Sequence, residues 1–74
     1  NDLESLEKLS KLVKKNFPES MLSAYYIGIY HEKSGNLRKA LIRYKSGLLL
    51  EPSQFIDKEI MLDKIYDLQE ETDN

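Results

Sequence analysis

Two pairs of small residues, one pair on each of two successive helical segments, most constrain what this chain can fold into. Ala24 and Gly28 are four residues apart, and Ala40 and Gly47 are seven apart. Residues at these spacings share one side of an α-helix. Each segment therefore carries a row of small side chains along which another helix can pack closely. We therefore predict that residues 21–54 form two helices folded back on each other, with Gly28 packed against Ala40.

The turn between these helices is predicted at Gly35-Asn36. Glycine readily adopts the left-handed conformation that ends many helices, and asparagine is common at the start of the next helix. The first helix is expected from position 18 or 20 to 34, and the second over 37–50, where Pro52 stops it. Large residues beside the small ones fill the remaining space: Tyr25, Ile27, Tyr30, Leu41, Tyr44 and Leu48. The run Leu48-Leu49-Leu50 is expected to face inward.

One more helix is predicted on each side of this hairpin. Residues 2–16 carry apolar side chains at three- and four-residue steps, and Phe17-Pro18 ends that pattern. The last helix opens at Ser53 or Asp57. The apolar residues assigned to the two flanking helices are Leu3, Leu6, Leu9, Leu12 and Val13 in the first, and Ile60, Met61, Ile65 and Leu68 in the last. Phe55 is expected to pack at the entry of the last helix, Ile56 and Met61 to form a hydrophobic staple, and residues 70–74 to fray.

The predicted fold is therefore all-α, with three to four antiparallel helices in a single small domain over residues 1–74. A chain of 74 residues buries little of its surface, so a neighbour that adds stability is plausible. The chain begins at Asn1 without an initiator Met, which we interpret as the mark of a fragment of a larger protein.

The hairpin resembles a tetratricopeptide repeat (TPR), a helix-turn-helix unit with a period of about 34 residues. Ile27-Gly28 stands where the family has a large apolar residue followed by Gly, and Gly35 stands at the turn between the helices. The other matching positions are Ala40, Tyr44, Gly47-Leu48 and Pro52. The resemblance covers one repeat at about residues 21–54. By comparison with the family, residues 2–16 are either a worn half-repeat, which we favour, or a distinct packing helix, and the last helix is interpreted as a terminal cap.

The resemblance also implies a binding surface, because the first helix of each TPR lines a groove that holds a peptide or a partner's helix. The residues of this chain at the matching positions are Leu22, Tyr25, Tyr26, Ile29, Glu32 and Lys33. Tyrosines would give such a groove rigid contact area with a hydroxyl on each ring. The alternative for the same residues is burial under the first helix or a neighbouring repeat, since apolar helix faces more often belong to a core.

Catalysis is not predicted for this chain, and neither is a metal or another cofactor. His31 is the single histidine and cysteine is absent, so the usual nitrogen and sulfur ligands of a metal site are missing. We interpret His31 as a hydrogen-bonded packing residue. The sequence has no Gly-rich phosphate loop, and no apolar run reaches the roughly 20 residues that span a bilayer. The sequence does not indicate in which cellular compartment the protein is found.

Charge is distributed unevenly along the chain. The net charge of −2 argues against nucleic-acid binding, which requires a basic surface. Basic residues nevertheless crowd two of the predicted helices, and acidic residues gather at the end: Lys8, Lys11, Lys14 and Lys15; Arg38, Lys39, Arg43 and Lys45; Asp63, Asp67, Glu70, Glu71 and Asp73. We interpret these residues as solvated helix faces. A site for an acidic partner is the alternative.

The function predicted from the resemblance is noncatalytic protein–protein interaction or scaffolding. Two alternatives stay open. The chain could be a helical-repeat appendage of a larger enzyme such as an esterase-like hydrolase, or a self-association module in which Tyr25 and Ile29 pair across a two-fold axis.

Overall fold

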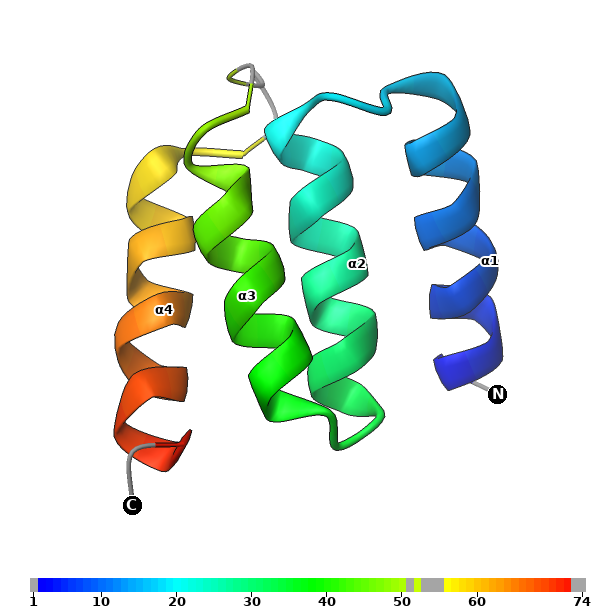
Figure 1. The fold of residues 1–74 in the computed structure, drawn as a ribbon. Coiled ribbons are helices and arrows are strands. Elements are labelled where there is room, and N and C mark those ends of the chain that lie inside the picture. Colours follow the sequence, from blue (N-terminus) through cyan, green and yellow to red (C-terminus); the bar gives the residue numbers. More distant parts are fainter. Residues whose placement is uncertain (1, 51, 53–55, 73–74) are drawn as a thin grey trace.

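The computed structural model describes residues 2–50, 52 and 56–72, and over these residues the chain is all-α. It forms four helices: α1 (Asp2–Asn16), α2 (Met21–Lys33), α3 (Leu37–Gly47) and α4 (Lys58–Thr72). Successive helices run antiparallel and lie side by side, in the order α1, α2, α3, α4 across the molecule (Figure 1). The predicted fold class and the helical hairpin of α2 and α3 are confirmed.

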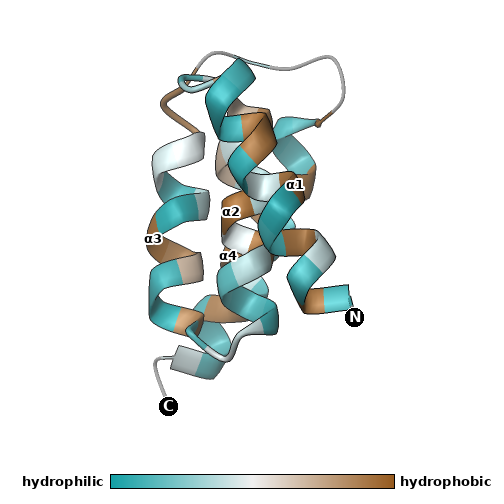
Figure 2. Ribbon diagram, turned by 90° about the vertical axis from the view of Figure 1, so that its right-hand side faces the viewer, coloured by the Kyte–Doolittle hydropathy of each residue, from teal (hydrophilic) through white to brown (hydrophobic). Residues whose placement is uncertain are grey.

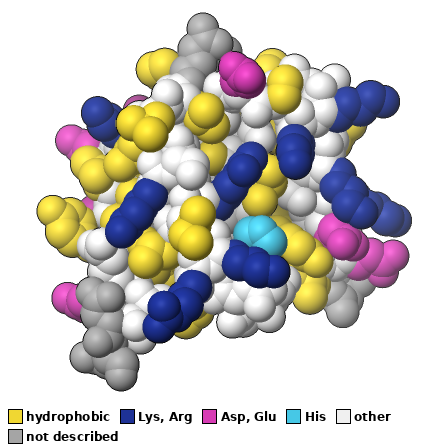
Figure 3. Space-filling model, in the orientation of Figure 1, with side chains coloured by type: hydrophobic (Ala, Val, Ile, Leu, Met, Phe, Trp, Pro, Cys, Tyr) yellow, Lys and Arg dark blue, Asp and Glu magenta, His cyan; other side chains and the backbone are white. Residues whose placement is uncertain are grey.

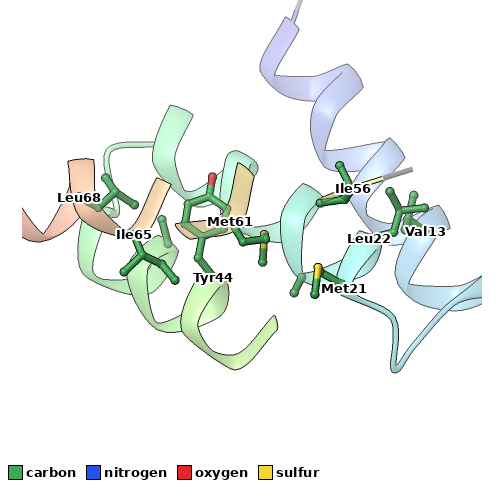
Figure 4. Close-up of a cluster of buried hydrophobic side chains, with 10 residues drawn as sticks. Val13, Met21, Leu22, Tyr44, Ile56, Met61, Ile65 and Leu68 are labelled. Carbon is green, nitrogen blue, oxygen red and sulfur yellow. The ribbon is translucent and has the colours of Figure 1, made fainter. Parts of the chain in front are cut away.

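The domain is a thin slab. Its Cα atoms extend over 36 × 29 × 14 Å, and each helix packs chiefly on its neighbours in the sequence. The core is a narrow band of buried apolar residues from all four helices and the segment before α4: Val13, Met21, Leu22, Ala24, Ala40, Tyr44, Ile56, Met61, Ile65 and Leu68. Figure 4 shows Val13, Met21, Leu22 and Ile56 toward α1, and Tyr44, Met61, Ile65 and Leu68 toward α4. A slab this thin leaves both broad faces of the helices to solvent.

Helix α2 begins at Met21, three residues later than a start at Pro18 would place it. The Ser20 hydroxyl decides this boundary, because its Oγ accepts a hydrogen bond from the backbone N–H of Leu22 at 3.1 Å. At the other end Gly35 has a φ of 85°, as the sequence predicts for the turn. Asn36 stands at the cap of α3 as expected, but its side chain makes no capping hydrogen bond to the described residues.

Replacing Gly35 with Ala should destabilise the domain by about 1 kcal/mol. A Cβ at this position would meet no atom within 4 Å, so the cost is the left-handed backbone conformation alone. Gly35→Asn should cost less, since asparagine tolerates this conformation better. Urea unfolding of the two variants beside the parent chain measures the difference. An Ala variant as stable as the parent would mean that the turn does not need a positive φ.

The end of α3 differs from the prediction. The helix ends at Gly47, and the backbone N–H groups of Leu49 and Leu50 bond to the carbonyls three residues earlier, which is the tighter pattern of a closing turn. Leu49 consequently points outward and is 89% exposed, so its predicted inward orientation is wrong. Pro52 lies beyond this turn and is not what stops the helix.

Helix α4 follows Asp57, one of the two predicted start points, and Ser53 and Phe55 lie outside the described residues. Ile56 and Met61 are both buried, as the predicted staple requires. Ile60 is 40% exposed and so lies at the margin of the stripe formed by Met61, Ile65 and Leu68. The helix continues to Thr72, so the prediction that residues 70–72 fray is wrong. Positions 73 and 74 lie outside the described residues.

Helix α1 is less buried than its leucine pattern predicts. Val13 and Ser10 are its buried residues, whereas Leu12 is 56% exposed and Leu3 and Leu9 are each 39% exposed. Figure 2, which looks onto α1, shows brown apolar residues recurring among teal polar ones along this helix. The reason is geometric: among the described residues α1 packs chiefly on α2, so the leucines that continue around the helix are less covered.

Candidate partner-binding face

Helix α2 carries the predicted groove residues. It is apolar and packs between α1 and α3. Its contact with α3 is set by Gly28. A Cβ added to Gly28 would lie 2.7 Å from Cδ1 of Tyr44, well inside van der Waals contact. Gly47 on α3 likewise meets Ala24, whose Cβ would be 2.8 Å from an added Cβ. The small residues therefore bring the two helices together as predicted.

The predicted partner of Gly28, however, was the wrong residue of α3. The atoms nearest to Gly28 belong to the Tyr44 ring, one helical turn beyond Ala40. Ala40 is fully buried and contributes to the core. The glycine thus makes room for a large ring rather than for a second small residue.

One broad side of α2 carries Leu22, Tyr26, Ile29 and Lys33. Spacings of four, three and four residues place these side chains in one row along the helix. Leu22 is 9% exposed and belongs to the core, Tyr26 and Ile29 are half-buried against that core, and Lys33 is exposed. We call Tyr26, Ile29 and Lys33, with Leu22 beneath them, the open face of α2.

An open hollow of about 440 Å³ lies where this row reaches α1. Its lining consists of Asp2, Leu3 and Leu6 from the first turns of α1, and Lys33 from the last turn of α2. The two leucines supply apolar surface, and the lysine and aspartate supply charges of opposite sign. The hollow is of a size that can hold one or two side chains of a partner.

Tyr25 and Glu32, the other two predicted groove residues, lie on the side of α2 that turns toward α3 and α4. The Tyr25 ring centroid is 5.6 Å from that of Tyr26, edge to face, and 6.4 Å from that of Tyr44. The Tyr44 hydroxyl donates a hydrogen bond to Oε1 of Glu32 at 2.9 Å, and Nζ of Lys64 lies 3.6 Å from the same oxygen. Glu32 therefore ties α2, α3 and α4 together.

The surroundings of the Tyr44 hydroxyl determine its protonation state. Burial, and then the hydrogen bond to Glu32 and the charge of that carboxylate, raise the pKa of Tyr44 well above its ordinary value. Tyr44 stays protonated and acts as a hydrogen-bond donor at any physiological pH. Its hydroxyl is a structural group that holds Glu32 in place.

Sequence reasoning did not find the Tyr44–Glu32–Lys64 link. The three residues are separated by 12 and 20 positions and belong to three helices. A signal was available for one part of it, since a tyrosine on the inner side of α3 needs a partner for its hydroxyl when buried. Which carboxylate accepts from it depends on the angle between the helices, which the sequence pattern does not give.

His31 faces the opposite side of α2 from the open face, between α1 and α3. Burial, and then the charges of Lys39 and Arg43, lower the pKa of His31 below its ordinary value. Its Nδ1 atom is buried and has no hydrogen-bond partner among the described residues. The interpretation of His31 as a hydrogen-bonded packing residue is therefore wrong in one respect: the ring packs, but this nitrogen stays unbonded.

No protein-family model, curated protein or solved structure matches the chain significantly. Within the described residues, no three His, Cys, Asp or Glu side chains are placed to hold a metal ion, and no helix is long and apolar enough to cross a membrane. The absence of catalytic activity and the TPR assignment both stay predictions.

Proposed function

We propose that this chain is a noncatalytic protein–protein interaction or scaffolding module of TPR type that binds a peptide or a partner's helix along the open face of α2. The observation that carries the proposal is the row Tyr26, Ile29 and Lys33 on the apolar helix that α1 and α3 flank. Support for the TPR type comes from the small-residue contacts of Gly28 and Gly47 and from the turn at Gly35.

The open face has the composition expected of a recognition surface. Tyr26 offers a rigid ring held edge to face by Tyr25, so little conformational freedom is lost when a partner covers it. Ile29 adds aliphatic surface next to it on the same row. The hollow beside Lys33 would accept an apolar side chain of the ligand against Leu3 and Leu6, with the lysine free to meet a carboxylate at the hollow's edge.

We expect different residues of α2 to contribute to binding and to folding. Leu22 belongs to the core, and Tyr25 and Glu32 contact Tyr44. Tyr26 is only partly buried against the core, and Lys33 is exposed. Tyr26 and Lys33 are therefore better probes of binding than Tyr25, whose removal would also disturb the contact with α3.

The test is selection of ligands from a library of displayed peptides, followed by NMR mapping on the labelled chain. We expect selected peptides to shift the amide signals of Tyr26, Ile29 and Lys33. The Tyr26→Ala, Lys33→Ala double variant should lose at least about tenfold in affinity, while its unfolding free energy falls by less than about 2 kcal/mol because Tyr26 is only partly buried against the core. Lys45→Ala on α3 is the matched surface control. Peptides that bind the double variant as tightly as the parent would refute the proposed face.

A second candidate is packing of this chain against a copy of itself or against another part of a larger protein, such as the enzyme considered above. Exposed apolar side chains on and after α1 favour this candidate. Leu9 is 39% exposed, Leu12 is 56% exposed, and Phe17, just after the helix, is 51% exposed. Sedimentation of the parent chain and of Leu12→Glu separates the cases. A parent dimer that the glutamate disperses supports self-association through α1, and a monomer at high concentration removes self-association.

A further inference from the structure

The broad face of the slab opposite to the open face of α2 is strongly basic. Figure 3 shows Lys and Arg side chains spread across the middle of this face around the single histidine, with Asp and Glu side chains at its margins. The chain as a whole carries a net charge of −2, so this face differs in sign from the rest of the molecule. A concentration of one sign of charge on one face attracts a partner of the other sign.

A shallow groove of about 200 Å³ runs between α1 and α2 on this face. Ile27, Tyr30 and His31 of α2 line it on one side, and Glu7, Ser10, Lys11 and Lys14 of α1 on the other. Lys39 and Arg43 belong to α3, which packs on α2, and they lie close enough to His31 for their charges to lower its pKa. We call these residues together the basic groove.

The basic groove already holds one carboxylate of the chain itself. Oε2 of Glu7 accepts a hydrogen bond from the Tyr30 hydroxyl at 3.3 Å and lies 3.9 Å from Nζ of Lys11. The groove thus offers a hydroxyl donor and an ammonium group to a carboxylate.

Three further cations of the groove have no such partner. Lys14, Lys39 and Arg43 make no ion pair with the described carboxylates. Nε of Arg43 and Nδ1 of His31 are both buried and bond to no acceptor in the described part of the chain. The exposed ammonium groups of Lys14 and Lys39 are the cations of the groove that an incoming carboxylate can reach most directly.

We propose that the basic groove binds a carboxylate-rich peptide segment of a partner protein, with Lys14, Lys39 and Arg43 meeting its acidic side chains. This surface is separate from the open face of α2, since Ile27 and His31 lie on the other side of that helix from Tyr26 and Ile29. The two sites can be occupied together. A partner on the basic groove would leave the peptide site of the proposed function accessible.

Binding of carboxylates should be coupled to protonation of His31. The groups that face the ring are Tyr30 on its own helix, Glu7, Lys11 and Lys14 on α1, and Lys39 and Arg43 on α3. Burial and the cations hold the pKa of His31 low in the free chain, and added carboxylates would raise it. The complex then takes up a proton, so affinity should rise as pH falls from the pKa of the complex to that of the free chain.

The probe for this site is hexaglutamate, with hexaglutamine as the uncharged control, titrated into the labelled chain at low and at physiological salt. We expect hexaglutamate to shift the signals of residues in the basic groove and to raise the midpoint of the His31 ring-proton titration. Its affinity should fall with added salt. Hexaglutamine should do none of these.

Two double variants of equal net charge decide whether the groove is the site. Lys14→Gln, Lys39→Gln should weaken hexaglutamate binding about tenfold. Lys8→Gln, Lys58→Gln removes two exposed lysines from elsewhere and should leave the affinity within about twofold. All four lysines are exposed, so both variants should keep the parent's melting temperature.

Several results would overturn the proposal. An equal loss in the two double variants would mean attraction to net charge alone. An unmoved His31 titration, or shifts outside the groove, would place the peptide elsewhere. A single-stranded oligonucleotide of the same charge that binds as tightly would remove the assignment to a peptide. If hexaglutamate did not bind at low salt, the proposal would be refuted.

Discussion

Replacing Tyr44 with Ala should destabilise the domain by about 3–5 kcal/mol and leave it largely unfolded at room temperature. The Tyr44 side chain is fully buried in the apolar core of the described residues, and deletion of a buried aromatic ring typically costs this much. A domain of this size has little stability in reserve. Circular dichroism on heating and in urea measures the loss.

Tyr44→Phe is the matched control, because it keeps the ring and removes the hydroxyl. It should cost about 1–2 kcal/mol, since Glu32 loses its hydrogen bond at 2.9 Å but retains Lys64 at 3.6 Å. The difference between the two variants isolates the packing of the ring. If Tyr44→Ala were as stable as Tyr44→Phe, the ring could not be the packed centre described here.

Gly28→Ala should destabilise the domain by about 1–2 kcal/mol, although alanine is the better helix former. Helix propensity favours the alanine by roughly 1 kcal/mol. The new methyl group would collide with the Tyr44 ring, which is enclosed on all sides, and overpacking of this kind costs about 1–3 kcal/mol or occasionally more. The steric term should therefore win. Urea unfolding of the variant beside the parent chain provides the value.

A double-mutant cycle tests this cause directly. In a Tyr44→Leu background the methyl group meets a smaller and more flexible side chain, so Gly28→Ala should become neutral or stabilising. Gly47→Ala should be milder than Gly28→Ala, because the methyl end of Met61 can swing away even though Ala24 must still shift. A Gly28→Ala penalty that persists unchanged without the Tyr44 ring would point to a different cause.

These residues also show how much of the molecule the sequence predicts. The spacing of Ala24, Gly28, Ala40 and Gly47 is enough to predict two closely packed helices, because small residues at helical spacing have few other uses. The left-handed turn at Gly35 follows from the same kind of local rule. The spacing does not predict which residues touch across the interface. Gly28 meets Tyr44 because one helix is shifted by one turn along the other, and the spacing of residues within each helix gives no information about that shift.

The candidate binding face stays a prediction, but the structure gives the burial of its residues. The resemblance to a TPR names six residues of α2, and the structure leaves Tyr26, Ile29 and Lys33 accessible while Leu22 is buried and Glu32 bonds to Tyr44. Periodicity places residues on a helix face but does not say how far the neighbouring helices wrap around that face. The same limit applies to α1, where leucine spacing predicts a buried stripe and Leu12 is 56% exposed.

The arrangement in which each helix touches chiefly the helices before and after it has a consequence for how the chain folds. Closing such contacts requires only short loops, so little chain entropy is lost before each contact forms. Chains of this kind cross a low barrier and fold within microseconds to milliseconds. The domain should therefore refold rapidly after each unfolding event, which limits the time that its unfolded chain is exposed to aggregation and proteolysis.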